Sequence, residues 1–203
     1  MEVAKLKPAR PVLYALPRGG VPVACPIAAA LKAPLDLLLV RKIGVPRQPQ
    51  LAAGAVVDGE GRDVIWNRDV LRAEALSEEA LKQAVANAYK EIERWRALYL
   101  SERAAIPVQD RTAVLVDDGM ATGSSMRAAI AAVRQRGPRR IIVAIPVAAR
   151  DVVRTLRELV EDVACLATPD GFHAVGNYYE DFHQLSDAEV ISLLARTRLS
   201  GAP

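Results

Sequence analysis

One segment of the chain places two carboxylates directly before a run of small hydroxylated residues. An apolar stretch at 114–116 is followed by Asp117 and Asp118, and the polar stretch 121–125 comes next. The members of that polar stretch are Ala121, Thr122, Gly123, Ser124 and Ser125. Small hydroxyls, backbone N–H groups and the positive end of a following helix dipole together form a cradle for a phosphate. The adjacent carboxylates repel a phosphate, but they accept hydrogen bonds from a vicinal diol such as that of ribose.

A simpler interpretation is that one Ser or Thr of this segment only caps the helix that follows. The whole string favours a ligand site instead, because Gly123 lets the backbone approach an anion closely and two carboxylates stand beside it. The segment is not a Walker A loop, since no Gly-Lys-Ser/Thr follows, and it is not a GxGxxG dinucleotide turn.

A second turn with binding potential is Arg18-Gly19-Gly20, which follows the apolar run 11–16. Two adjacent glycines permit backbone angles that point N–H groups at an anion. The Arg18 guanidinium can add a charge-assisted, forked pair of hydrogen bonds to phosphate oxygens. Taken alone this sequence is typical of an ordinary turn, but beside the first segment it indicates an anion site.

Further cations follow the next predicted strand, 35–40, at the same edge of the expected sheet. Arg41 and Lys42 end that strand, where they suit a ligand with many negative charges or form a solvated strand end. The segment 44–50 has two prolines, a glycine and no apolar periodicity, so we expect a loop that serves as a mobile lid.

The rest of the pattern predicts the elements that hold these turns. Strands are expected at 11–16, 35–40, 112–116, 140–146 and 163–168, and helices at 21–31, 126–136, 150–160 and 186–199. Continuous apolar strands that alternate with helices are typical of a parallel sheet covered on both faces. In such α/β folds, ligands bind at the carboxyl edge of the sheet, which is where both turns lie.

An antiparallel hairpin and a long helix interrupt this alternation. The segments 53–57 and 62–66 flank an Asp-Gly-Glu-Gly sequence typical of a hairpin turn. A helix from Ser77 to about Arg103 carries one apolar stripe, made of Leu81, Val85, Ala88, Ile92, Trp95 and Tyr99. That stripe packs either on its own domain or on a second subunit.

These motifs resemble those of the type I phosphoribosyltransferase family, whose members bind 5-phosphoribosyl-1-pyrophosphate (PRPP). The resemblance runs from Leu13 to about Asp187. It implies that Asp117 and Asp118 hold the ribose hydroxyls and that 121–125 hold the 5-phosphate. It also implies that Arg18, Gly19 and Gly20 form the pyrophosphate loop, aided by Arg41, Lys42 and Arg47.

The reaction that the resemblance implies is displacement of pyrophosphate from C1 of the ribose by a ring nitrogen. Asp117, Asp118 and Arg18 would then be the catalytic residues. Mg²⁺ is the implied cofactor, held largely by substrate phosphates and water rather than by a dedicated protein cage. Asp117 or Asp118 would touch the ion directly or through water.

The segment 169–185 resembles the hood that covers the base in hypoxanthine–guanine phosphoribosyltransferases. There Phe172 would stack on the base, with Val175 and Asp181 beside it. A hydrophobic plug is the alternative for Phe172. Those purine enzymes carry an aspartate where this chain has Ala121, whereas adenine and uracil enzymes carry alanine there. The acceptor is therefore open between purine and pyrimidine bases.

Composition sets limits on the remaining function classes. About half of the residues are hydrophobic, the net charge is +3, and no run of like charges indicates nucleic-acid binding. Cys25 and Cys165 lie in apolar stretches and are expected to be small buried hydrophobes. We see neither a secretory signal nor an apolar run long enough to span a membrane, so a cytoplasmic protein is expected.

We therefore expect one domain over 1–203: a core at 10–168, an inserted hairpin and long helix at 58–105, the hood at 169–185 and a final helix at 186–199. The expected partners are PRPP and a nucleobase-like acceptor, and the expected assembly is a homodimer. Two alternative functions are a sensor that binds PRPP without transferring it and a partner-binding protein that uses the long helix.

Overall fold

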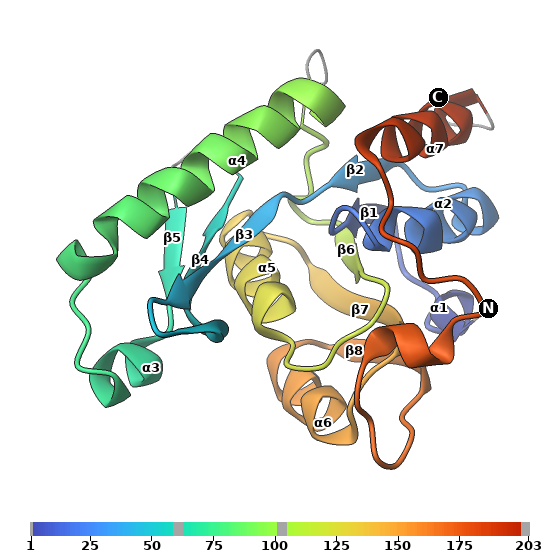
Figure 1. The fold of residues 1–203 in the computed structure, drawn as a ribbon. Helices are drawn as coiled ribbons and strands as arrows, with labels where there is room; N and C mark the ends of the chain where they lie inside the picture. Colours follow the sequence, from blue (N-terminus) through green and yellow to red (C-terminus); the bar gives the residue numbers. More distant parts are fainter. Residues whose placement is uncertain (1, 59–62, 101–104, 200–203) are drawn as a thin grey trace.

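A five-stranded parallel sheet forms the centre of the protein (Figure 1), in a computed structural model that describes residues 2–58, 63–100 and 105–199. Its strand order is β2-β1-β6-β7-β8, and each neighbouring pair is parallel. The strands are β1 (Pro11–Ala15), β2 (Leu35–Leu37), β6 (Thr112–Val116), β7 (Arg140–Val147) and β8 (Asp162–Ala167). The expected α/β class and the parallel sheet are confirmed.

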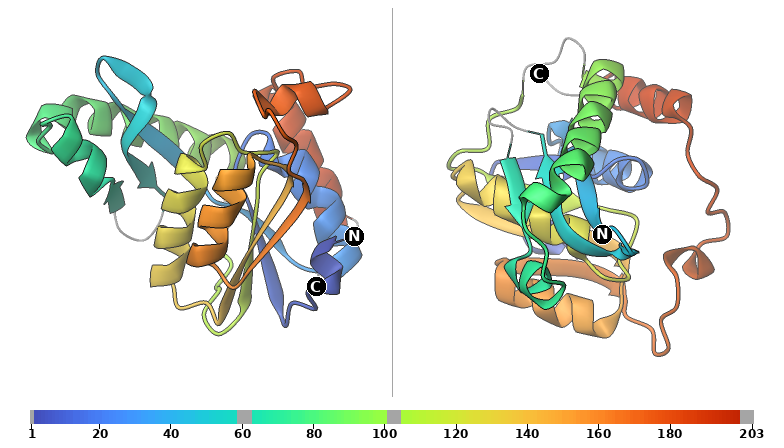
Figure 2. Two further views of the ribbon diagram at one scale, coloured as in Figure 1. Left: turned by 90° about the horizontal axis from the view of Figure 1, so that it is seen from below. Right: turned by 60° about the vertical axis from the view of Figure 1, so that its left-hand side comes forward.

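Helices cover both faces of this sheet, as Figure 2 (left) shows. One face carries α1 (Glu2–Lys5), α2 (Gly20–Leu31) and α7 (Asp187–Leu199), and the other carries α5 (Ser124–Gln135) and α6 (Arg150–Leu159). Every residue of β6 is buried between the two layers. This double burial explains why its sequence is a continuous apolar run rather than an alternating one.

The strand register brings two loops together at the carboxyl edge. Ala15, the last residue of β1, pairs with Val116, the last residue of β6. The segments that follow β1 and β6 therefore leave the sheet side by side and at the same level.

A second sheet, antiparallel and three-stranded, is built from residues between β2 and β6. Its strands are β3 (Val40–Val45), β4 (Gln48–Val57) and β5 (Asp63–Trp66). The hairpin of β4 and β5 was expected, although the centre of its turn lies outside the described residues. The predicted strand 35–40 was wrong at its end, because β2 stops at Leu37 and Val40 already belongs to β3 in the other sheet.

The segment 44–50 is a second hairpin rather than the predicted loop. β3 and β4 stay paired up to Val45 and Gln48, with register shifts on both sides of Gly44. A Cβ on Gly44 would lie 2.8 Å from the carbonyl oxygen of Pro49, so the glycine permits the strands to approach here. Pro46 lies in the turn at 46–47, and Pro49 lies beside Gly44, where the register shifts.

The long helix packs on this small sheet within its own chain. It comprises the 3₁₀ turn η1 (Glu79–Leu81) and α4 (Lys82–Leu100), and Figure 1 shows it lying across β3 to β5. Leu81, Ala88, Ile92 and Tyr99 of the predicted stripe are buried in the same core as residues of β3 and β4. The stripe is therefore used inside the chain. The short helix α3 (Arg68–Ala73), capped by the Asn67 side chain, had not been predicted.

Candidate functional site

The turn after β1 is packed tightly against the end of β6. The Pro17–Arg18 peptide bond is cis, and the N–H of Gly20 donates to the carbonyl of Leu16 over 2.9 Å. A Cβ on Gly20 would lie 2.5 Å from the carbonyl oxygen of Val116. Only glycine fits at this position, because the atom in the way belongs to the backbone of a buried strand.

Gly19 faces the carboxylate of Asp118. A Cβ on Gly19 would lie 2.5 Å from Cγ of Asp118 and closer still to Oδ2. The Arg18-Gly19-Gly20 turn and the paired aspartates thus share one surface at the carboxyl edge of the sheet. The sequence placed the two turns at this edge, and the structure brings them into direct contact.

Asp117 and Asp118 form a closely coupled pair. The N–H of Asp118 donates to Oδ1 of Asp117 over 3.0 Å. Burial, and next the negative charge of Asp118, raise the pKa of Asp117 well above its ordinary value. Burial likewise raises the pKa of Asp118. A pair that is costly to ionise gains from a nearby hydrogen-bond donor or cation.

The stretch 121–125 comprises the end of the turn after β6 and the first two residues of α5. Gly123, at φ 68°, precedes the first residue of α5, and no side chain caps this helix. Ala121 and Thr122 are exposed, and the hydroxyls of Thr122 and Ser124 lie 3.2 Å apart. The hydroxyls are thus not used to satisfy the helix N-terminus, so the simple capping interpretation does not describe this turn.

The segment after β8 packs against the paired aspartates and the residue that follows them. The Tyr179 hydroxyl donates to the carbonyl of Asp118 over 2.5 Å. Burial raises the pKa of Tyr179 to about 12, so the hydroxyl stays protonated at neutral pH. Val175, in the 3₁₀ turn η2 (Val175–Tyr178), packs so closely on Gly119 that a Cβ there would meet Cγ1 of Val175 at 2.7 Å. Tyr179 was not among the residues predicted to form the site.

Two predicted base-binding residues have partners inside this segment. The Phe172 ring stacks on Tyr178, with centroids 5.5 Å apart and planes inclined by 12°. Asp181 is exposed, and its carboxylate contacts Nδ1 of His183 at 3.0 Å. The hydrogen bond from His183 lowers the pKa of Asp181. One face of Phe172 is therefore already covered by a neighbouring ring.

The remaining predicted cations lie in the antiparallel sheet. Arg41 and Lys42 are inside β3, opposite Val56 and Ala55, and so do not end a strand of the parallel sheet as predicted. The Arg41 guanidinium lies 5.7 Å from the centroid of the Trp95 ring on α4. Arg47 is exposed in the turn between β3 and β4. The prediction for Arg41 and Lys42 was wrong because the predicted strand 35–40 includes the end of one sheet's strand, β2, and the start of the other sheet's strand, β3.

Comparison with known proteins adds an independent line of support. A sequence model of the phosphoribosyl transferase domain matches residues 4–181. The chain belongs to the phosphoribosyl transferase domain family. This match spans the whole parallel sheet and the turns that follow β1 and β6.

Proteins similar to this phosphoribosyl transferase domain support the same family assignment. Two Mycobacterium tuberculosis proteins, "Putative phosphoribosyl transferase Rv0571c" and "Putative phosphoribosyl transferase MT0597", are each 42% identical over 194 residues. The match covers 96% of this chain but 43% of each relative, so the chain spans less than half of their length. The crystal structure of TT1426 from Thermus thermophilus is 39% identical with a TM-score of 0.79, and the match covers 96% of this chain and 91% of that one.

The raised pKa of Asp117 makes the stability of the phosphoribosyl transferase domain depend on pH. Above the ordinary carboxyl pKa, the folded state holds a proton that the unfolded state has lost, so the free energy of unfolding falls as pH rises through the folded pKa. We expect Asp117→Asn to raise the melting temperature at neutral pH by a few degrees, since about 1 kcal/mol shifts a domain of this size by about 2–4 °C. The gain should vanish near pH 3.

Thermal melts between pH 3 and pH 8 test this expectation. Asp69→Asn is the matched control, because the Asp69 carboxylate is exposed and pairs only at the surface with Arg72. A melting temperature of Asp117→Asn that is lower than that of the wild type at pH 7 would contradict the expectation.

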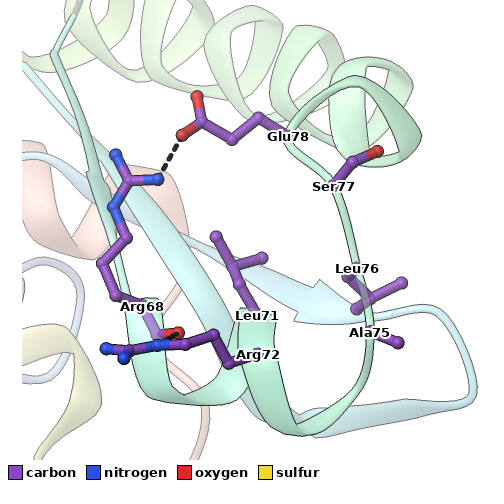
Figure 3. Close-up of a pocket in the computed structure, with 7 residues that line it drawn as sticks. All are labelled: Arg68, Leu71, Arg72, Ala75, Leu76, Ser77 and Glu78. Atoms are coloured by element: carbon purple, nitrogen blue, oxygen red, sulfur yellow. Dashed lines mark hydrogen bonds and ion pairs between the residues drawn. The ribbon is translucent and has the colours of Figure 1, made fainter.

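The structure also has an open groove, which Figure 3 shows. It has a volume of about 440 Å³ and lies between α3 and the segment that leads to η1. Its lining residues are Arg68, Leu71, Arg72, Ala75, Leu76, Ser77 and Glu78, and the Arg68 guanidinium pairs with Glu78 at 2.5 Å across it. None of the residues predicted to bind the ligand lines this groove.

Three other expectations concern the described part of the phosphoribosyl transferase domain. Cys25 and Cys165 are both free and partly buried there, rather than joined in a disulfide. Across the described residues, no group of three or more His, Cys, Asp or Glu side chains is arranged to hold a metal ion. Of the helices in that same part, none has both the length and the apolar character needed to cross a membrane.

Proposed function

We propose that this domain transfers the 5-phosphoribosyl group of PRPP to a ring nitrogen of a nucleobase and releases pyrophosphate. The contact between Asp118 and Gly19 carries the proposal. It places a carboxylate that can accept hydrogen bonds from a diol beside a turn that can bind an anion, so that one ligand can contact both. The uncapped N-terminus of α5 beside them supplies the third subsite, for the 5-phosphate. The three subsites match the three chemical parts of PRPP.

In the proposed reaction, the lone pair of the acceptor nitrogen forms the bond to C1. The bond between C1 and the pyrophosphate oxygen breaks, its electron pair leaves with pyrophosphate, and the acceptor loses its N–H proton to solvent. Asp117 and Asp118 hold the ribose hydroxyls and stabilise the positive charge that develops on the sugar ring. Arg18 and the backbone of Gly19 and Gly20 stabilise the negative charge that develops on the leaving group.

The Asp117 and Asp118 carboxylates also fit the expected Mg²⁺. Hard oxygen donors are the ligands that this ion prefers, and a coupled pair with raised pKa values gains from a nearby cation. When bound, Mg²⁺ neutralises negative charge on the pyrophosphate. The side chains would touch it directly or through water, with substrate oxygens completing its coordination.

The acceptor site that we propose lies under the segment 169–185, which Tyr179 and Val175 hold against the aspartates. Ala121 offers no group that takes up a proton, so the acceptor is a purine or pyrimidine base that is nucleophilic without a general base. Phe172, stacked on Tyr178, presents its other face as the platform for the base, with Asp181 at the outer edge. The assembly that we propose is a homodimer, which light scattering tests.

The variant Arg18→Ala tests which end of the ligand Arg18 contacts. We expect it to weaken binding of PRPP with Mg²⁺ about 10- to 100-fold, the usual range for the loss of a hydrogen bond to a charged group. Binding of ribose 5-phosphate, which lacks pyrophosphate, should change less than twofold. Isothermal titration calorimetry measures both, and equal losses for the two ligands would show that Arg18 is not at the pyrophosphate end.

The function itself is tested by titrating the protein with PRPP and Mg²⁺ and then assaying pyrophosphate release with a panel of purine and pyrimidine bases. Turnover with one base supports the proposal and identifies the acceptor. Binding without turnover on the whole panel favours a PRPP sensor. Absence of binding contradicts both functions.

A further inference from the structure

The Arg18 side chain meets a carboxylate from a distant part of the chain. Nη1 of Arg18 lies 3.9 Å from Oδ1 of Asp187, the first residue of α7. Among the described residues, Asp187 is the single carboxylate within ion-pair distance of Arg18. Both side chains are about one-third exposed, so the pair lies at the edge of the site rather than in the core.

Asp187 is itself held by two groups of α4. The Tyr99 hydroxyl donates to Oδ1 of Asp187, the same oxygen that faces Arg18. Nη1 of Arg94 donates to Oδ2 over 3.1 Å. Tyr99 is 4% exposed, and burial raises its pKa to about 12, so the donating proton is retained throughout the neutral range. The carboxylate is thus fixed on one side and faces Arg18 on the other.

The capping of α7 does not require Asp187. Ser186 and Glu189 form the cap, because Oγ of Ser186 accepts from the N–H of Glu189 over 3.3 Å and Oε2 of Glu189 accepts from the N–H of Ser186 over 2.8 Å. The side chain of Asp187 points instead to α4 and the Arg18 turn. Its contacts are therefore separable from the formation of the helix.

We propose that Asp187, held by Tyr99, is a positioning residue that orients Arg18 toward the pyrophosphate of PRPP. The inference rests on the proposed function. A free arginine side chain loses much rotamer entropy when a ligand immobilises it, and orientation in advance removes part of that cost. The long Arg18–Asp187 distance leaves guanidinium donors for the ligand, and Arg94 offsets the charge of Asp187. The inserted helix α4 thereby supports the binding turn of the parallel sheet.

Asp187→Asn and Tyr99→Phe test this role by calorimetry with PRPP and Mg²⁺ and with ribose 5-phosphate. Each substitution should weaken PRPP binding about fivefold, in line with the cost of ordering one long side chain, and leave ribose 5-phosphate binding unchanged. Added to Arg18→Ala, either substitution should cause no further loss, since there is then no guanidinium to orient. Ser186→Ala is the matched control: it weakens the cap of α7 without touching Arg18, and PRPP affinity should stay at the wild-type level.

Three outcomes would overturn the inference while the wild type still binds PRPP. Tighter binding by Asp187→Asn would mean that Asp187 competes with pyrophosphate for Arg18. A PRPP affinity that falls no more than the ribose 5-phosphate affinity would show that Asp187 does not act at the pyrophosphate end, and additivity with Arg18→Ala would show that Asp187 does not act through Arg18. A wild-type protein that does not bind PRPP would instead overturn the proposed function, and this inference with it.

Discussion

The double variant Asp117→Asn/Asp118→Asn is expected to bind PRPP with Mg²⁺ about a thousandfold more weakly than the wild type. Two charge-assisted hydrogen bonds to the ribose hydroxyls are lost, and each contributes about 1.5–3 kcal/mol. The fold should survive, because the amide is the same size as the carboxylate and the carboxylates are costly to bury. Burial raises the pKa of both groups, so their replacement by asparagine should increase the free energy of unfolding at neutral pH.

Affinity and stability are therefore expected to change in opposite directions in this variant. Calorimetry measures the first and a thermal melt at pH 7 the second. A loss of affinity with a lower melting temperature would point to damage rather than to a lost ribose contact. Unchanged affinity would contradict the ribose assignment of Asp117 and Asp118.

The sequence predicted the parallel sheet well, because its strands are buried on both faces and read as uninterrupted apolar runs. β6 was located at its observed bounds, and the adjoining turn with Gly123 followed from residue types alone. The buried stripe on α4 was likewise visible as a local spacing of apolar residues. These features depend on residues that are close in the sequence.

The sequence could not show where the chain passes from one sheet to another. The run 35–40 is largely apolar on both sides of that point, because Leu38 and Leu39 are buried between the sheets. No polar or glycine signal marks the end of β2, so Arg41 was assigned to the wrong sheet. Similarly, Gly44 and the prolines of 44–50 are typical of a loop, and only pairing with β4 shows that they form a hairpin.

The contacts that complete the site are long-range, so no local pattern in the sequence indicates them. Tyr179 reaches the carbonyl of Asp118, and Tyr99 reaches Asp187, across large separations in the chain. Tyr99 was recognised as part of an apolar stripe, and this is correct for its ring. The Tyr99 hydroxyl has a separate role as the donor to Asp187, because the hydroxyl of a buried tyrosine needs a hydrogen-bond partner.

Gly19→Ala is expected to remove most PRPP binding while the domain stays folded. The backbone at Gly19 is helical, with φ −61° and ψ −32°, so alanine is conformationally acceptable there. Its Cβ, however, would overlap the carboxyl group of Asp118, whose Cγ lies 2.5 Å away. Asp118 must then rotate away from the ribose position. The loss of its charge-assisted hydrogen bond, about 1.5–3 kcal/mol, corresponds to a loss of PRPP affinity of about 10- to 100-fold.

Gly20→Ala, one residue further on, provides the contrast. Its Cβ would meet the carbonyl oxygen of Val116 at 2.5 Å, and this backbone atom of a buried strand cannot move aside. We therefore expect Gly20→Ala to lower the melting temperature strongly, whereas Gly19→Ala lowers it little. Comparable melting temperatures for the two variants would contradict this distinction between a side-chain and a backbone obstacle.

A double-variant cycle shows whether Gly19→Ala acts through Asp118. In an Asp118→Ala background the overlapping carboxyl group is gone, so adding Gly19→Ala should cause no further loss of PRPP affinity. If the two losses add instead, the alanine disturbs the pyrophosphate turn itself, and the contact between Gly19 and Asp118 is not what joins the two halves of the site. Non-additivity would establish that glycine at position 19 is required because the ribose carboxylate occupies the space where a side chain would be.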